Sequence, residues 1–526
     1  MGRGHHAPPY VEFAAMKQKI LTLAVVLVLP LLVGAAAAPL AQAQTIPGII
    51  YVPDDYPTIQ GAVDAAAPGD TIIIRDGSYT ENIIVTTDHL TIRSENGAVS
   101  TVVVAADPDA NVFNITADYV SIAGLTVTGA TEKCRAGINL TESSYCDICD
   151  NTAIGNYQGI CLKDSHHNTL TGNTANENDY FGIRLYYSPL NTLRNNSMER
   201  NVCNFYSWSR TSLKELRQDA DTSNKVDGKP IYLLLDKSDL VIDSSTNAGY
   251  VAVINSTNIT VRDLNITHSG HGVLFAYTNN SRIENVTGCY DKHSFQLFRS
   301  HNNVVIGNLA CNNIYDGFRI WNSTNNVLLN NTSKGNRNGA FLHCSDNTLT
   351  NHTAISNHYG IYLEGPSNNN TLTHCSFVAN HFGIFSRGSV DNSIYLNELV
   401  NNTLNVFSFG LGNIWESPQR LIYTYNGSDY TGRLGNYWGD YESKYPDAEE
   451  IDSTGVWDTP YGIRVSAPAV PQDDNCPLVA PASHYLVTGS IPAEPSWLSR
   501  YWWAIVAVAI IAVLLVCFLK KSKSKG

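Results

Sequence analysis

Apolar and polar residues alternate in short runs that return at a nearly constant interval along most of the chain. The repeated motif is Gly-Ile-x-Leu or a close variant, as at residues 182–185. Within two blocks its first residue recurs at steps of 21 to 23, at Gly137, Gly159 and Gly182 and at Gly272, Ser294, Gly317, Gly339, Gly360 and Gly383. Repeats this short bury their apolar residues only by stacking on one another, which predicts a solenoid.

Each repeat holds three short strand-like pieces separated by turn residues. Alternation in the third piece predicts that Ile183 and Leu185 face inward while Arg184 and Tyr186 face outward. We therefore predict an all-β fold: a right-handed parallel β-helix solenoid with three strands per coil and repeats of 21 to 23 residues.

Asparagine recurs in two columns of turn positions. The first column is Asn156, Asn178, Asn201, Asn313, Asn336, Asn357, Asn380 and Asn402, and the second is Asn168, Asn191, Asn303, Asn326, Asn347, Asn370 and Asn392. Stacked strands lie ~4.8 Å apart, so equivalent side chains can hydrogen-bond along the stack. We assign these asparagines a structural role.

The pattern changes at the ends of the chain and once in the middle. Residues 1–44 resemble a signal peptide region, with an apolar run at 20–33, and Met16 is the expected true start. The β-helix is predicted over 45–409, with a capping helix around 58–67 and a charged, helical excursion within 207–230. Residues 410–487 lack the repeat and are expected to cap the open end, followed by a linker at 488–500.

A C-terminal transmembrane helix is predicted at 501–519, because about 20 apolar residues span a bilayer. Lysines at 520, 521, 523 and 525 follow it and should stay cytoplasmic, so 520–526 is the expected cytoplasmic tail. The localisation expected is the cell membrane, single-pass, with the ectodomain on the extracellular side. The chain has a net charge of -13, which argues against nucleic acid as a partner.

Three segments carry a resemblance to a known family. They are YVPDDYPTIQGAVDAA at 51–66 with PGDTI at 68–72, VDGKPIY at 226–232, and GNYWGDY at 435–441 with DTPY at 458–461. They resemble the NosD-like β-helix family of pectin-lyase-like solenoids, named for a periplasmic copper-binding accessory protein and including archaeal surface proteins. The resemblance implies the fold and leaves activity open, because the shared motifs are caps and turns.

The same resemblance bears on cofactors. Copper is one cofactor that the resemblance implies. Relatives often carry an Asp/Gly-rich stretch between the last two motifs, and YPDAEEIDSTG at 445–455 is a poor version of it, so copper and calcium both stay open.

Outward columns of a β-helix form flat faces suited to extended polysaccharides, whose sugars stack on aromatic rings. The predicted carbohydrate-binding face is Tyr315, Trp321, His343, His358, His381 and Arg387. The alternative is an ordinary solvated sheet face with scattered aromatic residues.

Catalytic candidates on this face are Arg319, Arg337, Glu364 and Asp316. A glycosidase needs two carboxylates roughly 5 to 9.5 Å apart. Two rungs separate Asp316 from Glu364, about 10 Å from strand spacing alone, which disfavours hydrolysis. A lyase would use an arginine as base beside a group that neutralises a uronate.

Cys146, Cys149, His166 and His167 form a local cluster, near Cys134 and Cys161, of the side chains that bind copper or zinc. The alternatives are a disulfide or a substitution in the asparagine column, because Cys146 has the register of Asn168. Cys289 and Cys311 are also 22 residues apart and can stack.

Fifteen Asn-x-Ser/Thr sequons occur in the chain, some of which arise by chance from the asparagine columns. The candidate glycosylation sites are Asn114, Asn139, Asn255, Asn265, Asn285, Asn322, Asn351 and Asn426.

The sequence thus favours a membrane-anchored cell-surface protein with a structural or carbohydrate-binding role, whose partners are extracellular polysaccharide or envelope components. A polysaccharide lyase or glycoside hydrolase and a copper-binding accessory protein remain the alternatives. The absence of a tight catalytic motif favours a protein that is not an enzyme.

Overall fold

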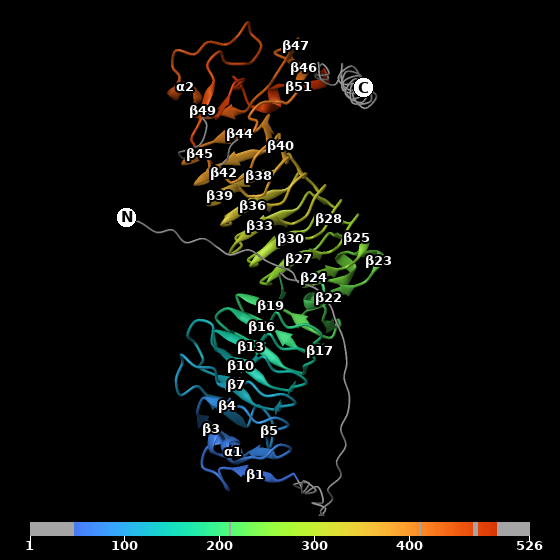
Figure 1. The fold of residues 1–526 in the computed structure, drawn as a ribbon, viewed down its shortest axis with the longest axis vertical. Helices are drawn as coiled ribbons and strands as arrows, with labels where there is room; N and C mark the ends of the chain where they lie inside the picture. The colour runs from blue at the N-terminus through green and yellow to red at the C-terminus, as the bar shows by residue number, and fades with distance from the viewer. Residues whose placement is uncertain (1–46, 210–211, 410–411, 466–471, 492–526) are drawn as a thin grey trace, which may run out of the picture. The chain divides into compact units, whose positions relative to one another are not determined.

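Short strands stack in parallel, one repeat upon the next. A computed structural model describes residues 47–209, 212–409, 412–465 and 472–491. Strands β10 (Ala136–Thr141), β13 (Gln158–Lys163) and β16 (Phe181–Tyr186) pair in parallel, with Ile138, Ile160 and Ile183 in register. The predicted all-β parallel solenoid is confirmed, and Figure 1 shows its stacked rungs.

Three sheets form the sides of the N-terminal coils. One has eight strands, from β1 (Ile49–Val52) to β20 (Asp219–Ala220), and another begins with β3 (Gly77–Thr80) and reaches β21 (Lys225–Val226). The third has six strands: β4 (Ile83–Val85), β7 (Phe113–Ile115), β10, β13, β16 and β19 (Cys203–Trp208).

The sheet that reaches β21 continues into the C-terminal coils through a hairpin, and has 16 strands in all. Asp227 and Gly228 have φ of 46° and 74°, as a two-residue hairpin turn requires, and β21 pairs antiparallel with the next strand. The long strands that follow are β22 (Lys229–Leu235), β24 (Tyr250–Ile254), β27 (His271–Ala276), β30 (His293–Phe298), β33 (Asp316–Trp321), β36 (Asn338–His343), β39 (Tyr359–Glu364), β42 (Phe382–Arg387) and β45 (Leu404–Ser408).

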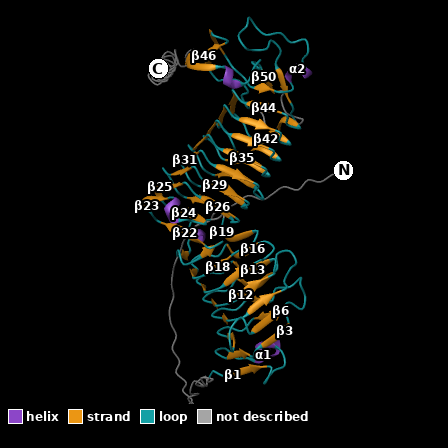
Figure 2. Cartoon of the chain, turned by 180° about the vertical axis from the view of Figure 1, so that it is seen from behind, coloured by secondary structure: helices purple, strands orange, loops and turns teal. Residues whose placement is uncertain are grey.

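Two eight-stranded sheets complete the C-terminal coils. They run from β23 (Ser238–Ile242) to β43 (Ser393–Tyr395) and from β26 (Asn265–Thr267) to β48 (Tyr437–Trp438). The view from behind shows the same stacking, with few helices among the strands (Figure 2).

Apolar side chains fill the inside of the coils. In β16, Ile183 and Leu185 are buried, whereas Arg184 and Tyr186 are partly exposed, as the alternation predicted. Burying a side chain of this size contributes roughly 1.5–3 kcal/mol. The same alternation occurs in β33 and β36, whereas β19, β24, β27 and β30 are buried at every position. This packing holds the outward columns at fixed spacing.

The asparagine columns form ladders of hydrogen bonds. Asn357 Nδ2 donates to the Ser333 carbonyl at 3.2 Å, and the Asn357 backbone N–H donates to Asn380 Oδ1 at 2.9 Å. A third column, which the sequence analysis did not separate, contains Asn308, Asn331 and Asn397. His352 and Cys375 occupy two of its positions. The ladders satisfy backbone groups inside the tight turns.

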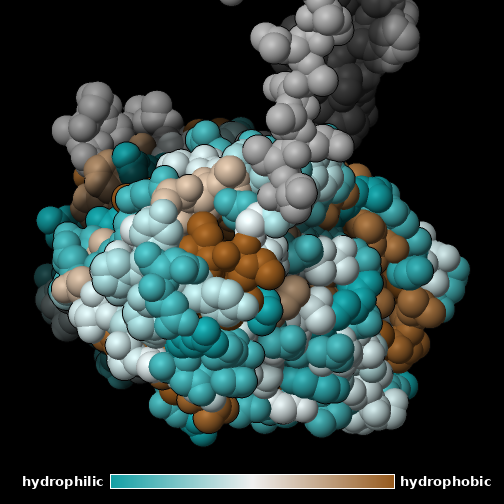
Figure 3. Space-filling model, turned by 90° about the horizontal axis from the view of Figure 1, so that it is seen from below, coloured by the Kyte–Doolittle hydropathy of each residue, from teal (hydrophilic) through white to brown (hydrophobic). Residues whose placement is uncertain are grey.

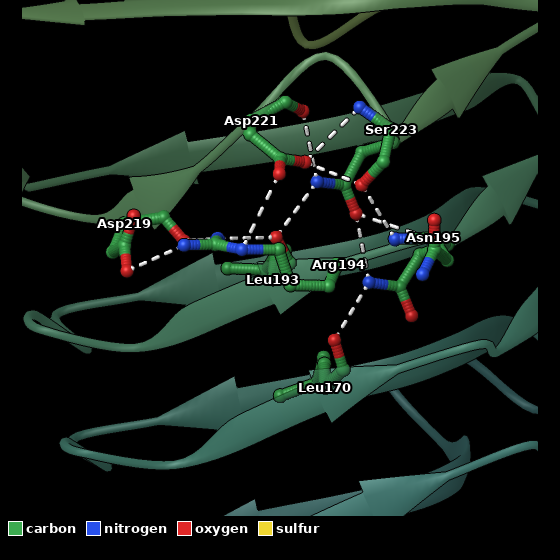
Figure 4. Close-up of polar contacts among 9 residues, drawn as sticks. Leu170, Leu193, Arg194, Asn195, Asp219, Asp221 and Ser223 are labelled. Atoms are coloured by element: carbon green, nitrogen blue, oxygen red, sulfur yellow. Dashed lines mark hydrogen bonds and ion pairs between the residues drawn. The ribbon is translucent and has the colours of Figure 1, made fainter.

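The segment after β19 is not the helical excursion that the sequence predicted. Between β19 and the hairpin, its described residues contain a short 3₁₀ turn, η1 (Lys214–Leu216), and the strands β20 and β21, but no α-helix. Asp219 and Asp221 both lie beside the Arg194 guanidinium, at 2.7 and 3.4 Å, and Ser223 accepts the Asn195 backbone N–H at 2.8 Å (Figure 4). Local ion pairs and turn contacts thus replace helical hydrogen bonds.

Both ends of the solenoid are covered. Helix α1 (Ile59–Ala65) lies where a capping helix was expected, and the Thr58 side chain accepts from the Gly61 backbone N–H. The surface seen from below, at the end that carries β1 and α1, is mostly hydrophilic with small apolar patches (Figure 3). Helix α1 contacts β1, β2 (Thr71–Ile74) and β4 at this end.

The C-terminal end is closed by a separate small sheet of β46 (Arg420–Tyr425), β47 (Ser428–Gly432) and β51 (Leu486–Ile491), with helix α2 (Tyr441–Lys444) and the pair β49 (Tyr461–Ile463) and β50 (Gln472–Asp474) beside it. Residues 488–491, assigned to a linker from the sequence, instead belong to β51, because they pair with β46.

The predicted signal region at 1–44, the rest of the linker, the predicted transmembrane helix at 501–519 and the tail at 520–526 lie outside the described residues. Within 47–491, apart from the gaps given above, no helix is both long and apolar enough to cross a bilayer.

Candidate functional site

A cleft of about 410 Å³ opens where the six-stranded sheet of the N-terminal coils ends beside the long strands of the C-terminal coils. The edge of β19 bonds to the segment before β27: the Asn204 N–H donates to the His268 carbonyl at 2.6 Å, and the Gly270 N–H to Phe205 at 2.9 Å. The cleft is lined by Arg184, Tyr186, Tyr206, Trp208, Lys292, His293, Tyr315, Asp316, Arg319, Arg337, Asn338, Phe341 and Tyr362.

Four polar side chains from three adjacent strands meet at the floor of the cleft. His293 Nδ1 lies 2.8 Å from Asp316 Oδ2, and each side chain is only 5% exposed. Arg319 Nη1 lies 3.1 Å from His293 Nε2. Asn338 Nδ2 donates to Asp316 Oδ1 at 2.6 Å. The cluster is therefore arranged by strand register, since His293, Asp316 and Asn338 occupy the same position of successive rungs.

The protonation states follow from the partners. Burial lowers the pKa of His293 to about 4, although Asp316 acts to raise it. Burial opposes ionisation of Asp316, but His293, Arg319 and Asn338 outweigh it and lower its pKa. At neutral pH the pair is a neutral imidazole beside an ionised carboxylate. Because a guanidinium only donates, Nε2 holds its lone pair toward Arg319 and Nδ1 carries the proton.

Basic side chains dominate the lining of the cleft. Arg184, Lys292, Arg319 and Arg337 line it, and Asp316 is the single acidic residue among the lining residues. The Lys292 ammonium lies 4.1 Å from the ring centroid of Tyr206, and the Arg337 guanidinium 6.0 Å from that of Tyr315. In a chain of net charge -13, this cleft is a local region of opposite charge.

An aromatic column continues from the cleft along successive rungs. Strand register places Phe341, Tyr362, Phe385 and Phe407 one above another, on the position of Arg319. Their neighbouring ring centroids are 5.4, 5.0 and 5.9 Å apart. All four rings are partly exposed, so their apolar surfaces are accessible beside the charged cleft.

The predicted carbohydrate-binding residues divide between the cleft and its surroundings. Tyr315 lines the cleft, whereas Trp321 and His343 lie in a neighbouring column with ring centroids 5.5 Å apart. His358 and His381 stack on each other at 4.9 Å outside the cleft. Arg387 is exposed and pairs in register with Glu364.

The catalytic candidates are also divided. Asp316, Arg319 and Arg337 line the cleft. Glu364 lies at the last position of β39, two strands beyond Asp316, which is at the first position of β33, and accepts from the Tyr362 hydroxyl at 3.3 Å. Asp316 is engaged with His293 rather than with a second carboxylate.

Sequence reasoning missed His293, His271, Lys292, Tyr206 and Trp208. A signal for part of the site was present, because the position before the repeated glycine or serine is His271, His293, Asp316 and Asn338 on four consecutive rungs. Other rungs place Ala136, Gln158, Phe181, Tyr359 or Phe382 there. Consecutive polar residues at a position that is otherwise mostly apolar or aromatic indicate a site.

The predicted metal cluster does not converge. Cys146 is buried, with its sulfur 3.5 Å from the Ala117 carbonyl, and burial raises its pKa and that of Cys149 to about 11. His166 and His167 are exposed, and His167 stacks on a tyrosine instead. The described residues of this segment therefore do not form a group of converging metal ligands.

More broadly, the described parts of the chain, residues 445–455 included, contain no group of three or more His, Cys, Asp or Glu arranged to hold a metal ion. Cys134 is exposed and Cys161 buried, each as a free thiol. Cys289 and Cys311, the second pair noted in the sequence, form a disulfide between adjacent rungs.

The candidate glycosylation sites lie at the surface to different degrees. Asn255, Asn265, Asn285, Asn322, Asn351 and Asn426 are exposed, and Asn114 and Asn139 are half-buried. Asn139 Nδ2 donates to Asn114 Oδ1 at 2.9 Å, so these two asparagines already bond to each other.

The fold and this cleft define a parallel β-solenoid with a basic, aromatic surface cleft. Residues 63–216 and 222–443 match the family described as periplasmic copper-binding protein (NosD), and the chain belongs to that family. No curated protein matches the sequence.

Solved structures with a similar arrangement include the catalytic domain of a GH87 alpha-1,3-glucanase in complex with nigerose, at 14% identity and a TM-score of 0.34, over 66% of this chain and 67% of that one. Another is the A-module of a mannuronan C-5 epimerase from Azotobacter vinelandii, at 17% identity and a TM-score of 0.29, over 68% of this chain and 93% of that one. Likenesses of this size carry no information about the activity of this chain.

Proposed function

We propose that this protein is a cell-surface β-helix protein that binds an acidic polysaccharide in the cleft beside β19. The observation that carries the proposal is the lining of the cleft, in which four basic side chains surround one buried carboxylate. A cleft lined by charge of one sign raises the local concentration of ions of the opposite sign, so this site attracts anions although the chain as a whole is acidic.

The aromatic residues of the cleft favour a sugar over a small inorganic anion. Tyr315 and Phe341 line the cleft with partly exposed rings, and Tyr206 and Trp208, each 4% exposed, also line it. Aromatic rings offer flat apolar surfaces to the carbon faces of sugar rings, while the arginines offer paired donors to a carboxylate. Together these groups match a chain of uronate residues.

The extent of the surface favours a polymer. The aromatic column adds two rungs beyond the cleft, at Phe385 and Phe407, with ~4.8 Å per rung. A monosaccharide would contact the cleft but not the aromatic rings beyond it. Anchoring through residues 501–519 would hold the cleft outside the cell, where such polymers occur.

The test measures retention of the purified full-length protein on immobilised acidic and neutral polysaccharides. Arg184→Gln with Arg337→Gln should weaken retention on the acidic polymers about tenfold or more, because hydrogen bonds to charged groups contribute ~1.5–3 kcal/mol each. The control is Arg262→Gln, whose side chain is 44% exposed on another side of the coil. Equal retention on neutral polymers, or unchanged retention of the double variant, would contradict the proposal.

A further inference from the structure

The floor of the cleft contains more than a binding surface requires. A binding site for carboxylates needs the arginines, but it does not need a neutral histidine held between a buried carboxylate and a guanidinium. Burying the Asp316 carboxylate costs free energy that its neighbours have to offset, and buried titratable groups with specific charged partners in a cleft are typical of functional sites. This arrangement therefore indicates a chemical role for the pair.

We propose that His293 is the base of an eliminative cleavage of uronate-containing chains, and that Arg319 blocks this base until a substrate carboxylate binds. The proposal rests on the proposed function, because it takes the same acidic polymer into the same cleft. The sequence pointed to Arg319 or Arg337 as a lyase base; the structure instead assigns the base to the neutral imidazole.

His293 is a neutral imidazole whose lone pair is positioned to accept a proton. Its Nε2 lone pair faces Arg319 Nη1 at 3.1 Å, and its Nδ1 lies 2.8 Å from Asp316 Oδ2. The carboxylate orients the ring and stabilises the imidazolium that forms when Nε2 takes a proton. Asp316 is in turn held by Asn338 at 2.6 Å, so it acts as a positioning residue.

Arg319 links substrate binding to exposure of the base. A guanidinium pairs with a carboxylate through two parallel hydrogen bonds, whereas Arg319 makes one bond to the neutral imidazole and a longer contact of 3.8 Å between its Nε and Asp316 Oδ2. A uronate carboxylate entering the cleft should therefore draw the guanidinium toward itself. This movement exposes Nε2 and at the same time neutralises the carboxylate beside the carbon that loses its proton.

Asn338 supplies a second feature of a ligand site. Its Oδ1 is buried and has no hydrogen-bond partner among the described residues, while its Nδ2 is engaged with Asp316. Asn338 also lines the cleft. A sugar hydroxyl donating to this oxygen would satisfy it and place the sugar ring next to His293.

The step balances without any further reactant. The C–H bond next to the carboxylate breaks, and the proton goes to His293 Nε2. The electron pair of that bond forms a carbon–carbon double bond to the adjacent carbon, whose bond to the glycosidic oxygen breaks. The oxygen keeps that electron pair and takes a proton from solvent, and the imidazolium later returns its proton to solvent.

The experiment incubates the full-length protein with each acidic polysaccharide that it retains, and measures unsaturated uronate ends and reducing ends together. Wild-type protein should form both in equal number. His293→Gln should lower the rate at least ~100-fold with retention unchanged, in the range of general-base catalysis. The matched control His484→Gln, at an exposed histidine of the C-terminal cap, should keep the wild-type rate.

Asp316→Asn tests the positioning role by a different readout. It should lower the rate and shift the pH profile of cleavage, because removing the carboxylate makes His293 harder to protonate. A circular dichroism spectrum and melting curve of each variant show whether it has folded.

The other outcomes are distinct. Retention without unsaturated ends overturns this inference and leaves the proposed function intact, whereas the absence of retention overturns both. Reducing ends without unsaturation, or solvent deuterium entering the sugar without cleavage, overturns the elimination step. Full activity of a folded His293→Gln variant overturns the assignment of the base.

Discussion

His293 and Asp316 occupy the same position of adjacent strands, with Nδ1 of the first 2.8 Å from Oδ2 of the second. The pairing register of the solenoid thus brings together two titratable groups that are 23 residues apart in the sequence. The contact is fixed by the backbone ladder, so it should persist without ligand.

The pKa of His293 can be changed in both directions by its neighbours. Asp316 raises it, while burial, Arg319 and Lys292 lower it, and His271 stacks on its other side. Arg319→Gln should therefore raise the pKa of His293 above its value of about 4, and Asp316→Asn should lower it. Titration of the histidine ring protons by NMR measures both shifts. A pKa of His293 that is the same in both variants would contradict this arrangement.

His352 should make stability depend on pH. It occupies an asparagine position of the third column, and burial lowers its pKa to about 4. The unfolded state, with a pKa of about 6.5, then binds the proton first, so stability is present above pH 6.5 and is lost as pH falls toward 4. The loss from this residue alone is about 3 kcal/mol, at about 1.4 kcal/mol per pKa unit.

His352→Asn should remove that part of the pH dependence, measured as the melting temperature at pH 7 and pH 4.5. The variant should melt at a more similar temperature at the two pH values than the wild type does. The control is the exposed His268→Asn, which should keep the wild-type dependence. An unchanged difference in the His352 variant would show that the histidine is not buried as described.

The asparagine ladders should contribute directly to stability. Asn357→Ala leaves the Ser333 carbonyl and the Asn336 backbone N–H without their side-chain partners. Each buried unsatisfied group costs ~1–3 kcal/mol, so the free energy of unfolding should fall by a few kcal/mol in denaturant titrations. Asn96→Ala, at an exposed asparagine, should change it by less than ~0.5 kcal/mol. Equal effects of the two substitutions would contradict the structural role of the ladder.

The proposed anchor can be tested by deletion. Removal of 501–526 takes away 19 apolar residues and the lysines that follow, so the protein should move from the membrane fraction to the soluble fraction. Cell fractionation measures this distribution. A variant lacking 501–526 that stays in the membrane fraction would contradict a single anchor.

Most of the solenoid could be predicted because its determinants are periodic and local. The interval between Gly317 and Gly339 sets the pairing of β33 with β36, and the turn asparagines mark the ladders directly. The linker at 488–500 was partly wrong, because pairing of β51 with β46 joins segments more than 60 residues apart. No local pattern reports such a contact.

The cleft could be predicted only in part. Asp316, Arg319 and Arg337 were found on their outward columns, but Tyr206 and Trp208 come from the other block of repeats. They meet the first group because the hairpin at Asp227 carries one sheet onward while the β19 sheet ends. The spacing of the repeats along the sequence does not indicate that one sheet ends here while another continues.

The most direct test of acidic-polymer binding is a calorimetric titration of the full-length protein with a uronate oligosaccharide and with the same oligosaccharide after reduction of its carboxyl groups. The account predicts binding of the acidic oligosaccharide that weakens as salt rises, and at least ~tenfold weaker binding of the reduced one. Equal affinity for both oligosaccharides, or no binding of either, would contradict it.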